Sequence, residues 1–208
     1  MPDQQQSSPY TDSRRGFQAF EKDLPGHNTT GFGGAEVSEL PMETCETMND
    51  SWGFNITDRN YKSVKKLVQY MVKAAGYNAN FLLNVGPMPD GTIQPEFADT
   101  LRKVGLWMAK YGETIYGTRG NIIPPKDWGM LTKKGKTIYM HILSKPENPS
   151  FIFIPELKDK ISKASLFVGQ KEINPIAIGF KQQQEGTFIF LDGVALDEID
   201  TVIQIELK

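Results

Sequence analysis

Apolar residues are spaced along the 208-residue chain in a way that separates a part with helices from a part without them. Between residues 60 and 76 they recur every three or four positions, which predicts an amphipathic helix of about four turns that ends at Gly76. A second helical stripe begins after Pro95, a residue favoured at the first position of a helix. The polar face of the first helix is expected to carry Lys62, Lys65, Lys66 and Lys73.

Two strands are expected to alternate with these helices. An almost unbroken apolar run over residues 80–87 is typical of a strand buried on both faces, as in parallel sheets. A shorter strand is expected near residues 37–45. The order strand, helix, strand, helix over residues 37–116 is the repeating unit of a parallel α/β fold.

After Gly117 the chain changes to short runs of high β propensity separated by glycine, proline, asparagine and aspartate. These runs span residues 138–144, 150–154, 164–168, 187–191 and 201–207. Residues 129–137 are interpreted as a turn with solvated lysines. The sequence therefore predicts the class α/β plus all-β, with an α/β part over residues 1–120, a linker over 121–135 and a small antiparallel β-sandwich over 136–208.

The α/β part is too short to be a complete barrel. A (β/α)8 barrel takes eight strand–helix units and typically about 250 residues, whereas two or three units are visible here. An open sheet of that size would leave its strands and helices half covered. We therefore expect the chain to be the C-terminal portion of a larger α/β domain, followed by a β domain.

Composition narrows the possible partners. Lys and Arg number 23 against 25 Asp and Glu, and this net charge of −2 indicates neither a nucleic acid nor a membrane surface as partner. His27, His141 and the single Cys45 form no metal-binding motif, so neither a metal nor another cofactor is expected. The polar N-terminus lacks the apolar centre of a signal peptide.

The candidate chemistry lies in residues 41–53, where Glu43 is followed nine residues later by Trp52. A carboxyl group with a raised pKa can protonate a leaving oxygen, and an indole offers a flat face to the C–H side of a pyranose ring. An acid beside a flat apolar surface is the pairing that a sugar site requires. Neither residue is diagnostic by itself.

Taken in order, four short motifs resemble the α-L-fucosidases of glycoside hydrolase family 29: Glu43-Thr44-Cys45, Ser51-Trp52-Gly53-Phe54, Asn80-Phe81-Leu82-Leu83-Asn84-Val85-Gly86-Pro87 and Asp90-Gly91. The likeness is strong over residues 36–117. It implies an irregular (β/α)8-like barrel followed by a C-terminal β-sandwich. It also implies retaining hydrolysis of terminal α-L-fucose from fucosylated oligosaccharides or glycoconjugates, through two carboxyl groups about 5 Å apart.

By its place in the motif, Glu43 corresponds to the acid/base of the family. The resemblance places the nucleophile on a barrel strand upstream of Met1, so the chain by itself is expected to be inactive and its partner could be the missing N-terminal half of the barrel. Met42 stands where relatives often carry Trp. The resemblance also implies export of the parent protein, to the periplasm or the exterior, or to the lysosome in a eukaryote.

Each candidate site residue has a structural alternative. Trp52 is predicted to contact the sugar, yet packing under its loop explains it nearly as well. Phe81 is a second candidate substrate contact, although barrel packing is favoured for Phe81, and strand-end hydrogen bonding for Asn84. Glu46 and Asp50 are interpreted as polar groups of a loop.

Two alternatives to fucose hydrolysis stay open. The β part could be a carbohydrate-binding or structural module without catalysis, but no exposed row of aromatic residues is evident in it, and Trp128 lies at its margin. The chain could also be a remnant without activity. Binding of fucosylated oligosaccharides by residues 130–208 alone would favour the binding module.

Overall fold

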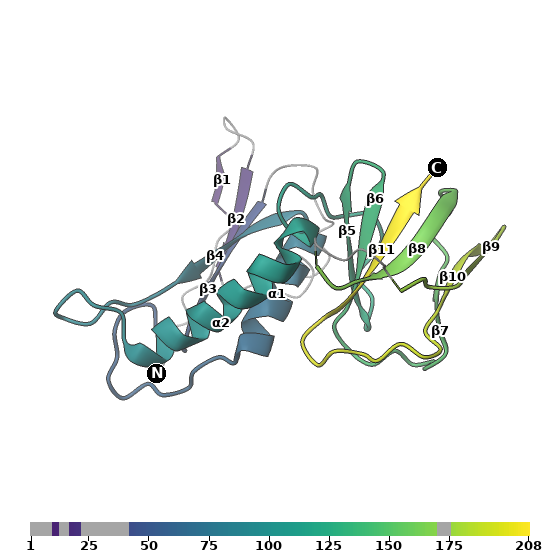
Figure 1. The fold of residues 1–208 in the computed structure, drawn as a ribbon. Helices are drawn as coiled ribbons and strands as arrows, with labels where there is room; N and C mark the ends of the chain where they lie inside the picture. Colours follow the sequence, from purple (N-terminus) through teal and green to yellow (C-terminus); the bar gives the residue numbers. More distant parts are fainter. Residues whose placement is uncertain (1–9, 13–16, 22–41, 170–175) are drawn as a thin grey trace.

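The computed structural model describes residues 10–12, 17–21, 42–169 and 176–208, the first two ranges as backbone alone. Figure 1 shows an α/β part and a β part lying side by side, with the C-terminus in the β part. The expected strand near residues 37–45 falls partly outside the described residues.

The α/β part contains a four-stranded sheet in the order β1-β2-β3-β4. Its strands are β1 (Tyr10–Asp12), β2 (Phe17–Glu21), β3 (Met42–Thr47) and β4 (Ala79–Asn84). β3 pairs in parallel with both β2 and β4, whereas β1 is antiparallel to β2. The predicted parallel arrangement is therefore confirmed for the strands that alternate with the helices.

The two helices begin where the sequence predicts. The Ser63 side chain caps α1 (Val64–Gly76) by accepting a hydrogen bond from the Lys66 amide at 3.2 Å. Pro95 occupies the first turn of α2 (Pro95–Tyr111), which is followed by the short 3-10 helix η1 (Gly112–Thr114). Both helices turn apolar stripes toward the rest of the protein, with Val68, Val72, Phe97 and Tyr111 buried.

The helices cover one face of the parallel sheet. Met42 packs with Ala74 of α1, and the hydroxyls of Thr44 and Tyr70 lie 2.8 Å apart. The alternate positions on each strand point away from α1. On β4 these positions include Asn80, which is exposed, and Leu82, which is 44% exposed. Within the described residues this second face of the sheet is therefore not covered.

The β part consists of two antiparallel sheets, ordered β5-β6-β11-β8 and β7-β10-β9. Their bounds are β5 (Gly129–Lys134), β6 (Thr137–Ile142), β7 (Phe151–Ile154), β8 (Ile161–Phe167), β9 (Phe180–Gln183), β10 (Gly186–Phe190) and β11 (Thr201–Leu207). Both sheets contribute to one apolar core, in which Ile138, Ile154, Ile189 and Ile205 are fully buried.

The predicted linker over residues 121–135 is wrong where it includes β5. Residues 129–134 pair with β6 along their whole length, and Leu131 and Thr132 are buried. Only Gly135, with a φ of +59°, and Lys136 belong to the turn that the lysine-rich composition suggested. The lysines hid this strand because Lys133 and Lys134 lie at its solvent end.

A second core joins the β part to the helices. Tyr139 and Val202 of the β5-β6-β11-β8 sheet pack against Val68, Val72 and Trp107 of the helices. Gln69 of α1 adds two hydrogen bonds, to the carbonyls of Leu143 at 2.8 Å and Ile199 at 2.9 Å. This sheet is therefore buried on both faces, which explains the continuous burial of β6 from Ile138 to Ile142.

Among the described residues, neither helix is long and apolar enough to cross a membrane.

Candidate functional site at the carboxyl ends of β3 and β4

Ligands of parallel α/β sheets bind outside the carboxyl ends of the strands. β3 and β4 end together, because Thr47 and Asn84 are partners in the register. The loop of residues 48–63 leaves β3 here and the loop of residues 85–94 leaves β4. This end of the sheet is the candidate site.

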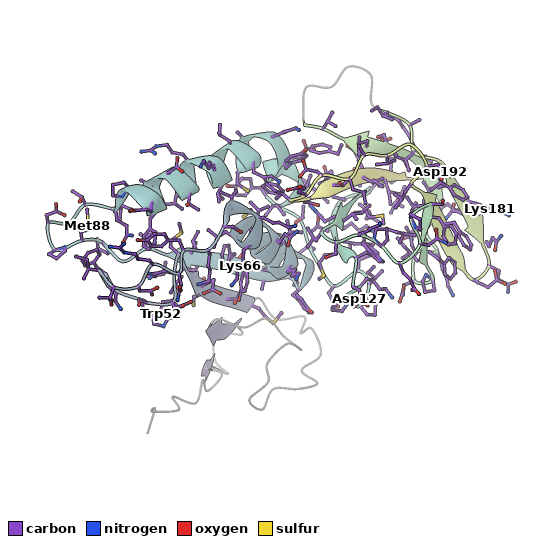
Figure 2. The ribbon with its side chains drawn as sticks, turned by 90° about the horizontal axis from the view of Figure 1, so that it is seen from below. Trp52, Lys66, Met88, Asp127, Lys181 and Asp192 are labelled. Atoms are coloured by element: carbon purple, nitrogen blue, oxygen red, sulfur yellow. The ribbon has the colours of Figure 1, made fainter. Side chains whose placement is uncertain are left out.

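Trp52 lies in the loop that follows β3, 39% exposed to solvent. Figure 2 places Trp52 at the same end of the molecule as Met88, which belongs to the loop after β4. An exposed indole at the carboxyl end of the sheet can offer its face to a sugar ring. The contact of Trp52 with a sugar stays a prediction.

β4 positions the loop that carries Trp52. The side-chain amide of Asn84 donates a hydrogen bond to the Trp52 carbonyl at 2.6 Å. Gly86 lies against the same loop so closely that a Cβ atom there would be 2.4 Å from the carbonyl carbon of Gly53. The sequence analysis favoured strand-end hydrogen bonding for Asn84 and named Gly86 only as part of a motif, and these contacts explain why an amide and a glycine stand there.

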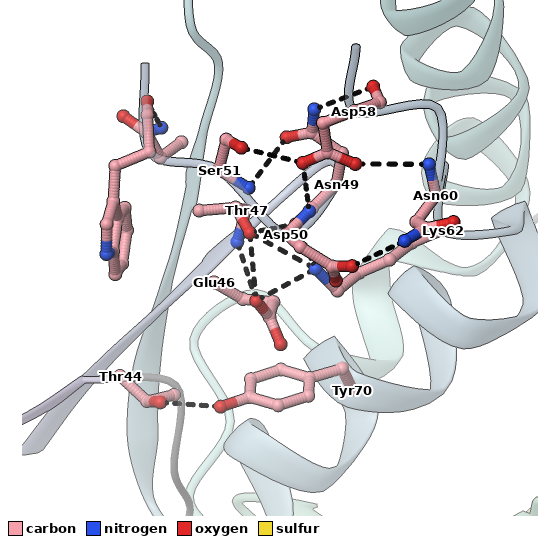
Figure 3. Close-up of polar contacts among 12 residues, drawn as sticks. Thr44, Glu46, Thr47, Asn49, Asp50, Ser51, Asp58, Asn60, Lys62 and Tyr70 are labelled. Carbon is pink, nitrogen blue, oxygen red and sulfur yellow. Dashed lines mark hydrogen bonds and ion pairs between the residues drawn. The ribbon is translucent and has the colours of Figure 1, made fainter. Parts of the chain in front are cut away.

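Asp58 organises the remainder of this loop (Figure 3). Its Oδ2 accepts hydrogen bonds from the Ser51 hydroxyl at 2.7 Å and the Asp50 amide at 3.0 Å, and its Oδ1 accepts one from the Asn60 amide at 3.1 Å. The Ser51 bond is the main reason that the pKa of Asp58 lies below its ordinary value of 3.8. Asp58 is therefore ionised at neutral pH, and the sequence analysis did not single it out.

A buried ion pair lies at the root of the loop. Lys62 Nζ is 3.2 Å from Glu46 Oε1, and both side chains are nearly excluded from water. Lys62 also donates to the Thr47 hydroxyl at 3.1 Å and to the Asn49 carbonyl. The expectation that Lys62 lies on a solvated helix face is therefore wrong. Lys62 precedes the helix, and its side chain is buried in an ion pair with Glu46.

Glu43 lies at the other end of β3. Its register partner is Asn80, the second residue of β4, and Thr47 is four positions further along β3, about 13 Å along a strand. Glu43 and Phe81 line a cavity of about 520 Å³ together with residues 115–119, which follow the second helix. Glu43 and Phe81 thus border one cavity, although strand alternation places their side chains on opposite faces of the sheet, and Trp52 does not line this cavity.

Phe81 packs in the layer between β4 and α1. Its ring centroid lies 5.2 Å from that of Tyr70, at an interplanar angle of 41°. Phe81 also joins the cluster around Met42 and Ala74. This position fits the packing alternative better than a sugar contact at the candidate site.

A hollow of about 500 Å³ adjoins the Trp52 loop at the carboxyl end, lined by Phe54, Asn55, Ile56, Arg59, Tyr61, Met88, Gln94, Pro95 and Glu96. Its mixture of apolar, aromatic and hydrogen-bonding groups suits a neutral polar ligand better than a purely apolar one. In the part of the chain that the structure describes, no three His, Cys, Asp or Glu side chains gather to hold a metal ion.

Two curated relatives illustrate the sequence similarity. The chain is 33% identical over 114 residues to the plasma alpha-L-fucosidase of Homo sapiens, which covers 50% of this chain and 24% of that protein. It is 28% identical over 135 residues to the tissue alpha-L-fucosidase of Bos taurus, covering 63% of this chain and 29% of that protein. The chain thus spans roughly a quarter of the length of these relatives.

Solved structures extend the similarity over both parts of the chain. The alpha-L-fucosidase isoenzyme 1 of Paenibacillus thiaminolyticus matches 92% of this chain and 45% of its own, with a TM-score of 0.75 and 31% identity. The alpha-fucosidase of Thermotoga maritima in complex with a mechanism-based inhibitor matches 91% of this chain and 42% of its own, with a TM-score of 0.68 and 26% identity. The model of the Alpha-L-fucosidase family matches residues 2–113, more than half of the chain. On these grounds the chain belongs to the alpha-L-fucosidase family.

Proposed function

We propose that this chain is the C-terminal portion of a retaining α-L-fucosidase that releases terminal α-L-fucose from fucosylated oligosaccharides or glycoconjugates. The observation that carries the proposal is the Trp52 loop, held by Asn84 and Gly86 at the carboxyl ends of parallel strands in a chain of this family. Family membership supports the reaction, and the loop supports a sugar site within these residues.

The finer fold is part of the same proposal. The parallel strands β2, β3 and β4 would be the last part of a (β/α)8-like barrel, ending near residue 120, and the two antiparallel sheets would form a β-sandwich from residue 129. The exposed second face of the parallel sheet, with Asn80 and Leu82, supports a missing barrel half, because parallel sheets are normally covered on both faces.

Trp52 is the proposed platform for the sugar. Glu43 and Asp58 are the two carboxyl groups compared as the proton donor. The acid/base role of Glu43 stays a prediction, and the direction of β3 weighs against it, because barrel active sites form at the carboxyl ends of the strands. Asp58 is the carboxylate that this reasoning favours, since its partner Ser51 adjoins Trp52.

The hydrogen bonds that keep Asp58 ionised oppose a role as proton donor in the chain by itself. A second carboxylate a few ångströms away raises the pKa of such a group, and a retaining mechanism supplies one in its nucleophile. The proposal therefore requires a carboxylate from outside this chain, and the chain alone is expected to release no fucose.

The test uses a parent protein in which the upstream coding sequence is restored. It is expected to hydrolyse α-L-fucosides, whereas the 208-residue chain is expected to show no turnover. Absence of hydrolysis by the parent protein on both natural and aryl fucosides would refute the proposed activity. Fucose release by the chain alone would refute the dependence on an outside nucleophile.

The proton donor is identified in the same parent protein by comparing Glu43→Gln with Asp58→Asn. Loss of the general acid slows cleavage of natural glycosides by about 10² to 10⁴, but has much less effect on aryl fucosides whose leaving groups need no proton. Only the variant with this selective loss removes the acid. A selective loss in Glu43→Gln would overturn the preference for Asp58.

A further inference from the structure

Four phenylalanines share the outward face of the β7-β10-β9 sheet. Strand alternation turns Ile152, Ile154 and Ile189 into the core, where all three are buried. The alternate positions of the same strands are Phe151, Phe153, Phe188 and Phe190, which are partly or more fully exposed and lie outside the apolar core clusters of the described residues.

Strand pairing gathers these rings into one surface. Phe188 is the register partner of Phe153, and Phe190 is the partner of Phe151. The Phe153 and Phe188 centroids lie 4.5 Å apart with their planes at 33°, and the Phe151 and Phe188 centroids lie 5.4 Å apart. Phe153 is 36% exposed, so the surface is open to solvent. The sequence analysis found no aromatic row here because Phe151 and Phe188 are 37 positions apart in the chain.

Hydrogen-bonding groups border the rings on the third strand. Lys181 of β9 is the register partner of Phe188, and Gln183 is the partner of Gly186, which has no side chain of its own to cover that position. Both polar side chains are exposed. An aromatic surface beside an ammonium and an amide matches a pyranose ring, whose C–H face packs on aromatic rings while its hydroxyls accept and donate hydrogen bonds.

The size of this face indicates a small ligand. Strands of four and five residues are about 13 to 17 Å long, and three strands span about 10 to 14 Å, so the face covers roughly 200 Å². A stable contact between two proteins buries about 800 Å² on each partner. The face is therefore too small by itself for a second copy of the chain, and is sufficient for one or two sugar rings.

We propose that the outward face of the β7-β10-β9 sheet binds a neutral oligosaccharide, with a pyranose ring packed on Phe153 and Phe188 and its hydroxyls bonded to Lys181 and Gln183. This site is distinct from the Trp52 loop, because Figure 2 shows Lys181 and Trp52 at opposite ends of the molecule. It does not depend on catalysis by the Trp52 site. In a fucosidase such a face would raise the concentration of glycan near the enzyme.

The test titrates the 208-residue chain with a fucosylated lactose trisaccharide, using isothermal calorimetry and saturation-transfer NMR. Phe153→Leu and Phe188→Leu keep apolar bulk on the sheet but remove the rings, and each is expected to weaken binding about tenfold, equivalent to 1.4 kcal/mol. Leu106→Ala is the control, since Leu106 is an apolar side chain that is 72% exposed on α2 and lies outside both proposed sugar sites, and this variant is expected to bind normally.

Lys181→Ala and Gln183→Ala are expected to weaken binding without altering the rings, and they keep the test decisive should a ring variant fail to fold. Phe153→Trp is expected to strengthen binding of the trisaccharide. The proposal is overturned if the trisaccharide does not bind at about 10 mM, well above weak lectin-like affinities. It is equally overturned if ring variants bind like the wild type, if Leu106→Ala abolishes binding, or if the ring variants only change the oligomeric state in ultracentrifugation.

Discussion

The most direct test of the structure replaces Lys62 by methionine. This change removes the Nζ atom that lies 3.2 Å from Glu46 Oε1 and donates to the Thr47 hydroxyl and the Asn49 carbonyl. The side chains of Lys62 and Glu46 are only 8% and 11% exposed, so water cannot replace the lost partner. Breaking a buried ion pair costs about 3 to 5 kcal/mol, because one charge remains without compensation.

Lys103→Met is the matched control. Lys103 Nζ is closer to its partner, at 2.7 Å from Asp99 Oδ2, but these side chains are 59% and 55% exposed on the surface of the second helix. Exposed pairs of this spacing contribute about 0.3 to 0.5 kcal/mol. If burial decides the loss of stability, Lys62→Met costs more than Lys103→Met. If the distance between the charged atoms decides it, the order is reversed.

The assay is urea unfolding of the 208-residue chain, followed by far-UV circular dichroism. Lys62→Met is expected to lower the free energy of unfolding by several kcal/mol, and Lys103→Met by less than about 0.5 kcal/mol. The double variant Lys62→Met/Glu46→Leu is expected to recover much of the loss, because it leaves no buried charge. Equal effects of the two lysine variants, or no recovery in the double variant, would refute the reasoning.

Three further predictions concern single contacts. Gly86→Ala is expected to lower the free energy of unfolding by about 1 to 3 kcal/mol and to speed hydrogen exchange in residues 48–60, because the new Cβ would overlap the Gly53 backbone. Gly53→Ala has open space around its Cβ and should do neither. The pKa of Asp58 is lowered in the fold, so its contribution to stability is present above about pH 4 and is lost as the pH falls through the lower pKa of the folded state. The amide NMR shifts of the loop should follow this transition. Asp58→Asn should abolish the transition. His141→Leu should cost about 3 kcal/mol or more in thermal unfolding, because Asp200 Oδ2, which is 2.7 Å from His141 Nδ1, would remain buried without that partner, and replacing both residues by leucine should restore part of the loss.

Sequence spacing was sufficient for elements whose structure depends on near neighbours. α1 ends at Gly76 and α2 begins at Pro95 as predicted, since apolar periodicity, glycine and proline act within one or two turns. The high β propensity of residues 201–207 likewise predicted the last strand. β5 was missed because its pairing with β6 and the packing of Met130 and Leu131 on distant apolar residues are not visible in its own lysine-containing sequence.

Some features of the candidate site could be predicted from neighbouring residues in the sequence, and others depend on packing. The motif around Trp52 pointed to the loop that follows β3, because the residues that identify this loop are contiguous in the chain. The positions of Glu43 and Lys62 depend instead on strand direction and on what packs above each side chain. Glu43, three positions before Glu46, looks equivalent to it in the sequence, yet the two lie at different points along β3. Among the residues that the structure describes, only Glu46 of these two pairs with a buried cation.

The amino-acid sequence by itself determined the family, the two helices, the alternation of strands and helices, and the polar loop that carries Trp52, because each rests on residues that are near one another in the chain. Only the tertiary structure decided which end of β3 each carboxylate occupies, which lysine is buried, and that four distant phenylalanines form one surface. The physical reason is that burial and charge pairing arise between segments far apart in sequence, and their register is set when strands and helices pack together.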